Sequence, residues 1–288
     1  MTDAFIESFI QSWHLFREAY LAGWLAAAAL AAVGVFVIAR DQIFVGAAIS
    51  EASALGVAVS LWVLTAAAPH AHGAFDVDPW CRASAVLFGL GAAAWTGRAR
   101  RAGDGASAEA VTGWVFLASG SGAILLVAQS PFGLEEVHRL LFSSIIGATW
   151  GDVAVLGALV LVGAATLAKY HRPLLLLTLD PVTARAVGVP VRRGAWAIVL
   201  ALGLVVGLTL RLAGLLFVFG NLVLPGLAAQ ALCREVRAML WTAPLVAVGA
   251  SVGAFVLANA WDLPPAQMDV AVLALVVAAL WIVRSLRS

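Results

Sequence analysis

The chain has 288 residues, of which 63% are hydrophobic and only 11% are charged, with a mean hydropathy of +1.00. A soluble globular protein averages about 45–50% apolar and about 25% charged residues, so this composition predicts an all-α integral membrane protein. The formal net charge of +1 provides no electrostatic basis for binding nucleic acid.

A spanning helix needs about 20 mostly apolar residues. This requirement predicts a single transmembrane domain over residues 1–288 with about nine helices, or eight if two segments are broken or only partly inserted. The two counts differ at the closely spaced pair of segments around Arg211. In chain order the expected helices cover 20–39, 43–66, 80–97, 110–129, 150–169, 194–211, 213–232, 238–259 and 267–283.

Basic residues in short loops set the orientation of a membrane protein, because they stay on the cytoplasmic side. With nine alternating helices, the Arg-rich loops after the first, third, fifth, seventh and ninth segments all fall on one side. The opposite loops contain PHAHGAFDVD, FGLEEVHR and WDLPPAQ, which are acidic or neutral. The pattern predicts an external N-terminus and a cytoplasmic C-terminus.

Two segments are not expected to cross the membrane. Residues 135–149 begin with polar side chains and predict an external amphipathic helix or hairpin. On the cytoplasmic side, Asp180 and Pro181 are a typical helix start, Ala184 continues a short helix, and Gly188 and Pro190 end it. This short helix is either a connector or a docking site for a cytoplasmic partner.

The chain shows no means of hydrolysing ATP. It has one lysine, Lys169, and no G-x-x-x-x-G-K-[ST] motif, so it contains no P-loop. Any ATP-driven process therefore requires a separate ATPase chain, and the protein itself is not expected to be an enzyme or to hold a permanent cofactor.

Glu51 is the clearest candidate for a functional side chain, because an acid in an apolar helix is costly and marks a functional site by default. It lies beside a stripe of small residues every four positions, which predicts close packing against a neighbouring helix. The stripe contains Gly46, Ser50, Ala54 and Ala58. Glu51 either attracts or coordinates a passing cation, or is protonated or hydrogen-bonded between helices.

Other polar residues have competing interpretations. Asn221 either hydrogen-bonds to a neighbouring helix or lines a translocation path, and Asp269 either faces the outer mouth of such a path or caps the last helix. In one external loop, His70, His72 and Asp76 carry ligand types suited to metal capture, although a solvated loop is the simpler interpretation.

Several blocks resemble the membrane permease subunits of ATP-binding-cassette importers for zinc, manganese and iron. GVFVIARDQIFVGAAISEASALGVAV is similar to the family's G-V-F-x-x-x-R-x-x-x-x-G-x-A-x-S-x-A-x-x-x-G-V-A, and a D-L-P precedes the last helix at Asp262. The blocks follow the family's order over almost the full chain. The other three are LLFSSIIGATWGDV, LDPVTARAVGVPV and GLLFVFGNLVLPGLAAQAL.

The resemblance implies the permease fold of the vitamin-B12-type importers, acting as a homodimer with the substrate passing along the dimer axis. It also implies a multi-pass protein of the inner membrane of a bacterial cell. Residues 179–191 would be the coupling helix that docks on an ATPase subunit. An extracytoplasmic metal-binding protein would deliver a divalent metal ion, the transported substrate, from outside.

One departure concerns the metal. The second helix of the family commonly reads G-D-A-[IL]-S-H-A, with Asp and His four residues apart on one helix face, and both are suitable metal ligands. Here Ala47 and Glu51 take those positions. The alternatives are therefore an importer of this fold with a non-metal substrate, or an ion-coupled secondary transporter, which would need several intramembrane acids.

Overall fold

The computed structural model describes residues 2–40, 42–67, 78–102, 108–128 and 145–287. Their contacts divide the chain into two compact units. Unit 1 comprises Met1–Asp41, Ser144–Ala195 and Leu216–Ser288, and unit 2 comprises Gln42–Ser143 and Trp196–Leu215. A single transmembrane domain over the full chain stays a prediction, because this division concerns contacts alone.

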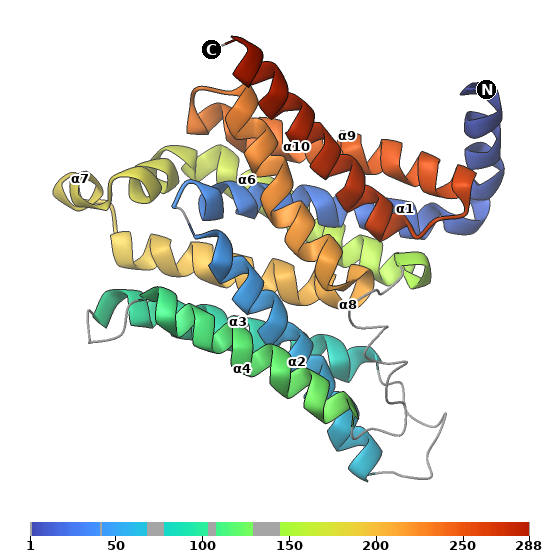
Figure 1. The fold of residues 1–288 in the computed structure, drawn as a ribbon. Coiled ribbons are helices and arrows are strands. Elements are labelled where there is room, and N and C mark those ends of the chain that lie inside the picture. Colours follow the sequence, from blue (N-terminus) through green and yellow to red (C-terminus); the bar gives the residue numbers. More distant parts are fainter. Residues whose placement is uncertain (1, 41, 68–77, 103–107, 129–144, 288) are drawn as a thin grey trace. The chain divides into compact units, whose positions relative to one another are not determined.

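Every regular element in the described part of the chain is a helix, which confirms the all-α prediction (Figure 1). The elements are α1 (Thr2–Ile38), α2 (Ile43–Ala67), α3 (Asp78–Ala102), α4 (Ala108–Ala128), the 3₁₀ turn η1 (Ile145–Gly147), α6 (Trp150–Leu179), α7 (Pro181–Ala186), α8 (Val191–Leu232), α9 (Val236–Trp261) and α10 (Pro265–Arg287).

Seven helices within the described ranges are long and apolar enough to cross a membrane, so the expected count of nine is not confirmed. The difference arises at two places. Helix α3 coincides with the third expected segment, but Arg98, Arg100 and Arg101 near its end lower its hydropathy. Helix α8 runs through the sixth and seventh expected segments as one element of 42 residues.

Helix α8 is interrupted at Gly214. This residue has a φ of 78° and a ψ of 169°, a conformation that is open only to glycine. At about 1.5 Å per residue, an unbroken helix of this length would extend about 63 Å, twice the thickness of a bilayer core of about 30 Å. The expected boundary near Arg211 therefore corresponds to a real break, three residues further along.

In unit 1, α1 packs against α9, α9 packs against α10, and α6 packs against α1. The second part of α8 also meets α1, because a side chain at Gly34 would overlap the backbone carbonyl of Leu222. A small cleft is lined by Phe16 and Tyr20 near the middle of α1, and by Asn259 and Asp262 at the end of α9. The middle of α1, the turn η1 that precedes α6, and the start of α10 therefore meet at one end of unit 1, which we call the cleft end.

The opposite end of unit 1 is rich in arginine, and we call it the Arg end. It contains the end of α1, the end of α6 with α7, the start of α9 and the end of α10. The basic residues there include Arg40, Arg172, Arg185, Arg234, Arg237 and Arg284. Helix α6 joins the two ends and, with 30 residues, is about 45 Å long.

In unit 2, α2 packs against both α3 and α4, and the first part of α8 lies against α3. A Cβ atom at Gly207 would lie 2.6 Å from the Cα atom of Val86, so these helices meet through their backbones. The small-residue stripe of α2 is buried as predicted, with Ser50 and Ala58 fully inaccessible. Ala58 packs against Ala123 and Val127 of α4.

The expected external segment at 135–149 is described only from residue 145 onward, where η1 and the start of α6 follow. Thr149 caps α6 with a reciprocal pair of bonds: its backbone N–H donates to the Asp152 carboxylate at 2.9 Å, and its hydroxyl accepts from the Asp152 N–H. This cap fixes the residue at which α6 begins.

Candidate functional site

Glu51 lies in unit 2, eight residues after the first residue of α2 and hence about 12 Å along the helix. Its side chain is half-buried and faces α4, where a Cβ atom at Gly120 would come within 3.1 Å of its Oε2 atom. The glycine therefore leaves the space that the carboxylate occupies. The residues one turn away on the same face, Ala47 and Leu55, are also only partly buried.

Two of the other predicted site residues meet inside unit 1. The Asn221 side-chain amide on α8 donates to the Asp269 carboxylate on α10 at 2.5 Å, and the Ser251 hydroxyl on α9 donates to the same carboxylate at 2.6 Å. All three residues have no exposed surface. Asp269 thus joins three helices, and it lies inside α10 rather than capping it.

This buried cluster contains one unsatisfied polar atom. The Asn221 amide nitrogen also donates to the Phe217 carbonyl at 3.2 Å, while its Oδ1 atom is buried without a hydrogen-bond partner. The bonds across α8, α9 and α10 are those expected of a packing role for Asn221. The alternative role in a translocation path would require this sealed cluster to open.

The short helix α7 begins as predicted. The Asp180 carboxylate accepts the backbone N–H groups of Val182 and Thr183, each at 3.0 Å, and the Thr183 hydroxyl at 2.5 Å. The hydrogen bond from the Thr183 side chain is the main reason that the pKa of Asp180 lies below its usual value. The carboxylate is therefore ionised at neutral pH and holds the cap.

The remaining predicted residues of this segment shape the turn. Pro181 is the first residue of α7, and Ala184 is the buried residue of this helix. Gly188 follows its end with a φ of 81°. Pro190 then precedes α8. Together with Asp180, these four residues form the backbone of a projecting turn and leave other side chains to make contacts.

The exposed surface of this turn is apolar and basic. Val182 is 74% exposed and Val187 is 63% exposed, while Arg185 is exposed between them. Neither valine stood out in the sequence, because a lone valine in a chain this apolar has no distinguishing pattern. Such exposed apolar side chains on a projecting turn are suited to contact with another protein.

No group of three or more His, Cys, Asp or Glu side chains comes together as a metal centre in the described part of the chain. His70, His72 and Asp76 lie outside the described residues, so metal capture by this loop stays a prediction. Glu51 belongs to unit 2, and the Asp269 cluster belongs to unit 1.

The model of the ABC 3 transport family matches residues 12–284. The chain belongs to this family. The match confirms the resemblance to permease subunits of ATP-binding-cassette importers and covers both units. The protein is accordingly a multi-pass transport subunit of an inner membrane.

Among the relatives of this ABC 3 family member is the "Manganese transport system membrane protein MntC" of Halalkalibacterium halodurans. It is 25% identical over 238 residues, which is 82% of this chain and 76% of the relative. The "High-affinity zinc uptake system membrane protein ZnuB" of Haemophilus influenzae is 20% identical over 245 residues, covering 85% and 88% of the two chains.

A solved structure supports the fold. PsaBC from Streptococcus pneumoniae, in complex with Fab, superposes with a TM-score of 0.79 at 20% sequence identity, covering 98% of this chain and 95% of the other. This likeness shows that the family member described here shares the fold of that chain.

The Asp269 cluster gives the first testable expectation. The change Asp269→Leu should lower the free energy of unfolding by roughly 2–4 kcal/mol, because it leaves the buried donors of Asn221 and Ser251 without an acceptor. The change Ser251→Ala removes one bond and should cost about 0.6–1 kcal/mol. Thermal unfolding in detergent measures both changes.

The change Asp269→Asn separates packing from a role in transport. It preserves the size of the side chain and one acceptor oxygen, and the Ser251 hydroxyl can turn to accept a bond. If Asp269 only joins helices, transport by this variant stays close to that of the wild type. Loss of transport in a variant that unfolds at the normal temperature would instead assign Asp269 to the translocation path.

Proposed function

We propose that this chain is the transmembrane subunit of an ATP-driven importer that carries a divalent metal ion: zinc, manganese or iron. The family match over residues 12–284 is the observation that carries this proposal, and relatives named for manganese and zinc transport support the substrate class. The metal ion is the transported substrate, delivered by an extracytoplasmic binding protein.

The energy for transport comes from a separate ATPase chain that docks on α7. The absence of a P-loop in the sequence requires such a partner. The projecting turn with exposed Val182, Arg185 and Val187 supports α7 as the contact, because an apolar surface flanked by charge is typical of the core and rim of a protein interface. The capped turn would transmit closure of the ATPase to α6 and α8.

We further propose that the Arg end of unit 1 is cytoplasmic and the cleft end is external, with the N-terminus outside and the C-terminus inside. The gathering of arginines at one end of unit 1 supports this orientation. Nine spans accommodate it if α3 and both parts of α8 cross the membrane. The permease acts as a homodimer with the architecture of the vitamin-B12-type importers.

Glu51 is the proposed station for the cation in the path. A half-buried carboxylate beside Gly120, on a face of α2 that its own unit leaves partly open, supports this role over that of a sealed packing residue. Ala47 and Glu51 replace the Asp and His pair expected from the family resemblance, and an importer of this fold with a non-metal substrate is the alternative that this departure favours.

The test is ATP hydrolysis by the reconstituted complex. The permease, its ATPase subunit and its binding protein are combined in liposomes, and zinc, manganese and iron(II) are added separately. We expect one of these metals to stimulate hydrolysis and accumulate in the vesicles. Uptake that proceeds without ATP and follows a proton or sodium gradient would instead identify a secondary transporter, and stimulation by no metal would favour the alternative substrate.

A further inference from the structure

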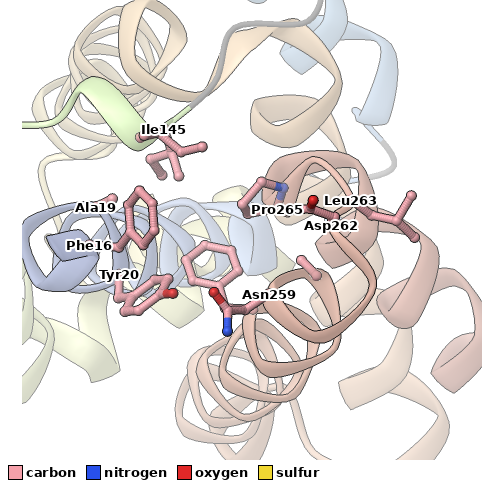
Figure 2. A pocket seen from close by; sticks show the side chains of 11 residues that line it. Phe16, Ala19, Tyr20, Ile145, Asn259, Asp262, Leu263 and Pro265 are labelled. Carbon is pink, nitrogen blue, oxygen red and sulfur yellow. The ribbon is translucent and has the colours of Figure 1, made fainter. Parts of the chain in front are cut away.

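The cleft end of unit 1 carries a small, well-defined cavity between α1, η1 and the turn that joins α9 to α10. Figure 2 shows Phe16 and Tyr20 on one side of the space and Asp262 and Pro265 on the other, with Ile145 and Asn259 completing the wall. Its volume is about 90 Å³. Sites for drug-sized ligands have about 300–1,000 Å³, so this cleft can hold only the end of one side chain or a group of that size.

Three of the side chains that line the cleft, Phe16, Tyr20 and Phe255, are aromatic. The rings of Tyr20 and Phe255 lie 5.7 Å apart between centroids, and those of Phe16 and Tyr20 lie 6.2 Å apart. Tyr20 is 4% exposed and Phe255 has no exposed surface, so packing holds both rings in place. Aromatic faces at the walls of a small cavity attract cations, most strongly when water is excluded.

The rim supplies a negative charge. Asp262 is exposed and adopts a left-handed conformation with a φ of 58°, which turns the chain from α9 toward α10. Among the described residues, no Lys, Arg or His lines the cleft. The nearest arginine on α1, Arg17, lies over the Trp150 ring with its Cζ atom 5.3 Å from the ring centroid.

An aromatic wall with a carboxylate at the rim is complementary to an ammonium or guanidinium group. The cleft lies at the opposite end of α6 from α7, about 45 Å away along a helix of 30 residues. If α7 contacts the ATPase in the cytoplasm, the cleft opens on the external side, where a binding protein arrives.

We propose that this cleft receives a lysine or arginine side chain of the extracytoplasmic binding protein and so positions that protein on the permease. The proposal rests on the proposed function, because it requires an importer with a binding protein and the orientation given above. Asp262 pairs with the cationic group, while Phe16 supplies the accessible aromatic surface, which the buried ring of Tyr20 supports from behind.

The experiment measures binding of the metal-loaded binding protein that co-purifies with the transporter. The assembled permease–ATPase complex is placed in nanodiscs that contain only phosphatidylglycerol, and biolayer interferometry gives the dissociation constant. We expect Asp262→Asn to weaken binding roughly tenfold, because the cationic group loses its partner. Asparagine is well tolerated in the left-handed region, so the turn survives this change.

Matched controls distinguish the effects of the Asp262 carboxylate and the Phe16 ring from a general loss of structure. Asp262→Glu retains the carboxylate and should stay within about twofold of the wild type. Glu18→Gln removes a nearby charge on α1 that does not line the cleft, and should have no effect. Phe16→Leu should weaken binding several-fold, whereas Leu15→Ala, at an exposed neighbouring position, should not.

The outcomes distinguish this inference from the proposed function. Unchanged binding by Asp262→Asn, with metal-stimulated ATP hydrolysis intact, overturns the inference and leaves the importer in place. If no binding protein associates with a complex that is active with metal, both the delivery step and the inference fail. An effect of Asp262→Asn that appears only when phosphatidylethanolamine is added would assign the cleft to a lipid amine and overturn the proposal.

Discussion

Replacing Glu51 by glutamine should abolish metal uptake while the assembled transporter remains in the membrane. Glutamine has nearly the same size and fits the space left by Gly120, so packing between α2 and α4 should survive. The substitution removes the negative charge that attracts a cation in a low-dielectric environment. A single charged ligand can contribute several kcal/mol to the binding free energy of the cation there. Uptake should fall by about a hundredfold or more.

Radioactive zinc or manganese uptake into proteoliposomes measures this effect, with thermal unfolding as the test of integrity. Glu109→Gln is the matched control, because Glu109 is an exposed acid at the start of α4. Normal uptake by the Glu51→Gln variant would remove Glu51 from the path and leave it as a packed polar residue. Glu51→Asp should retain partial activity, because the charge remains but moves back by one methylene group.

The combination A47D/E51H adds a test of substrate choice. It introduces the Asp and His pair, four residues apart, that the family resemblance leads us to expect on this helix. Imidazole and carboxylate together favour zinc, manganese and iron over hard cations such as magnesium. A change in metal preference would connect this face of α2 with selection of the substrate.

The second large effect is expected at α7. Val182→Asp should uncouple the permease from its ATPase, because a charge replaces an apolar side chain that is 74% exposed on the proposed docking surface. Burying an unpaired carboxylate in an interface costs several kcal/mol. We expect the ATPase subunit to dissociate during purification and metal-stimulated hydrolysis to fall to its basal rate.

Two controls keep this result specific. Val182→Ile preserves the apolar contact and should support normal transport, while Val162→Asp, at an exposed position within α6, tests the general effect of a new acid. The helix itself should persist in Val182→Asp, because the Asp180 cap and the Gly188 turn do not involve this side chain. Retention of the ATPase by Val182→Asp would place the docking surface elsewhere.

The sequence predicted α7 closely because its signals are local. A cap at Asp180, a proline at the first position and a glycine in the left-handed region act within a few residues, and each is visible without coordinates. Its exposed contacts were less predictable. In an apolar chain, Val182 and Val187 resemble many buried valines, and only the fold shows which of them face outward.

Features that depend on contacts between distant parts of the chain were harder to predict from the sequence. Asn221 and Asp269 were each singled out as polar residues in apolar helices, but they are 48 residues apart, so their hydrogen bond depends on how α8 packs against α10. Ser251, which completes the cluster, gave no signal because serine is common in packed membrane helices. The break at Gly214 was expected near Arg211, since hydropathy averages over a window and cannot identify the residue whose φ is positive.

Helix α6 has a mechanical consequence. Its 30 residues extend about 45 Å, so roughly 15 Å lies beyond a hydrocarbon core of about 30 Å. Pro173 lies near the end that carries α7, and it lacks the N–H group that would complete the backbone ladder there. The helix is therefore expected to be rigid over most of its length and to bend most easily at Pro173, close to one end. Small rotations of α7 can be accommodated by bending at Pro173. A larger displacement of α7 must move the whole of α6, including its end at the opposite membrane surface.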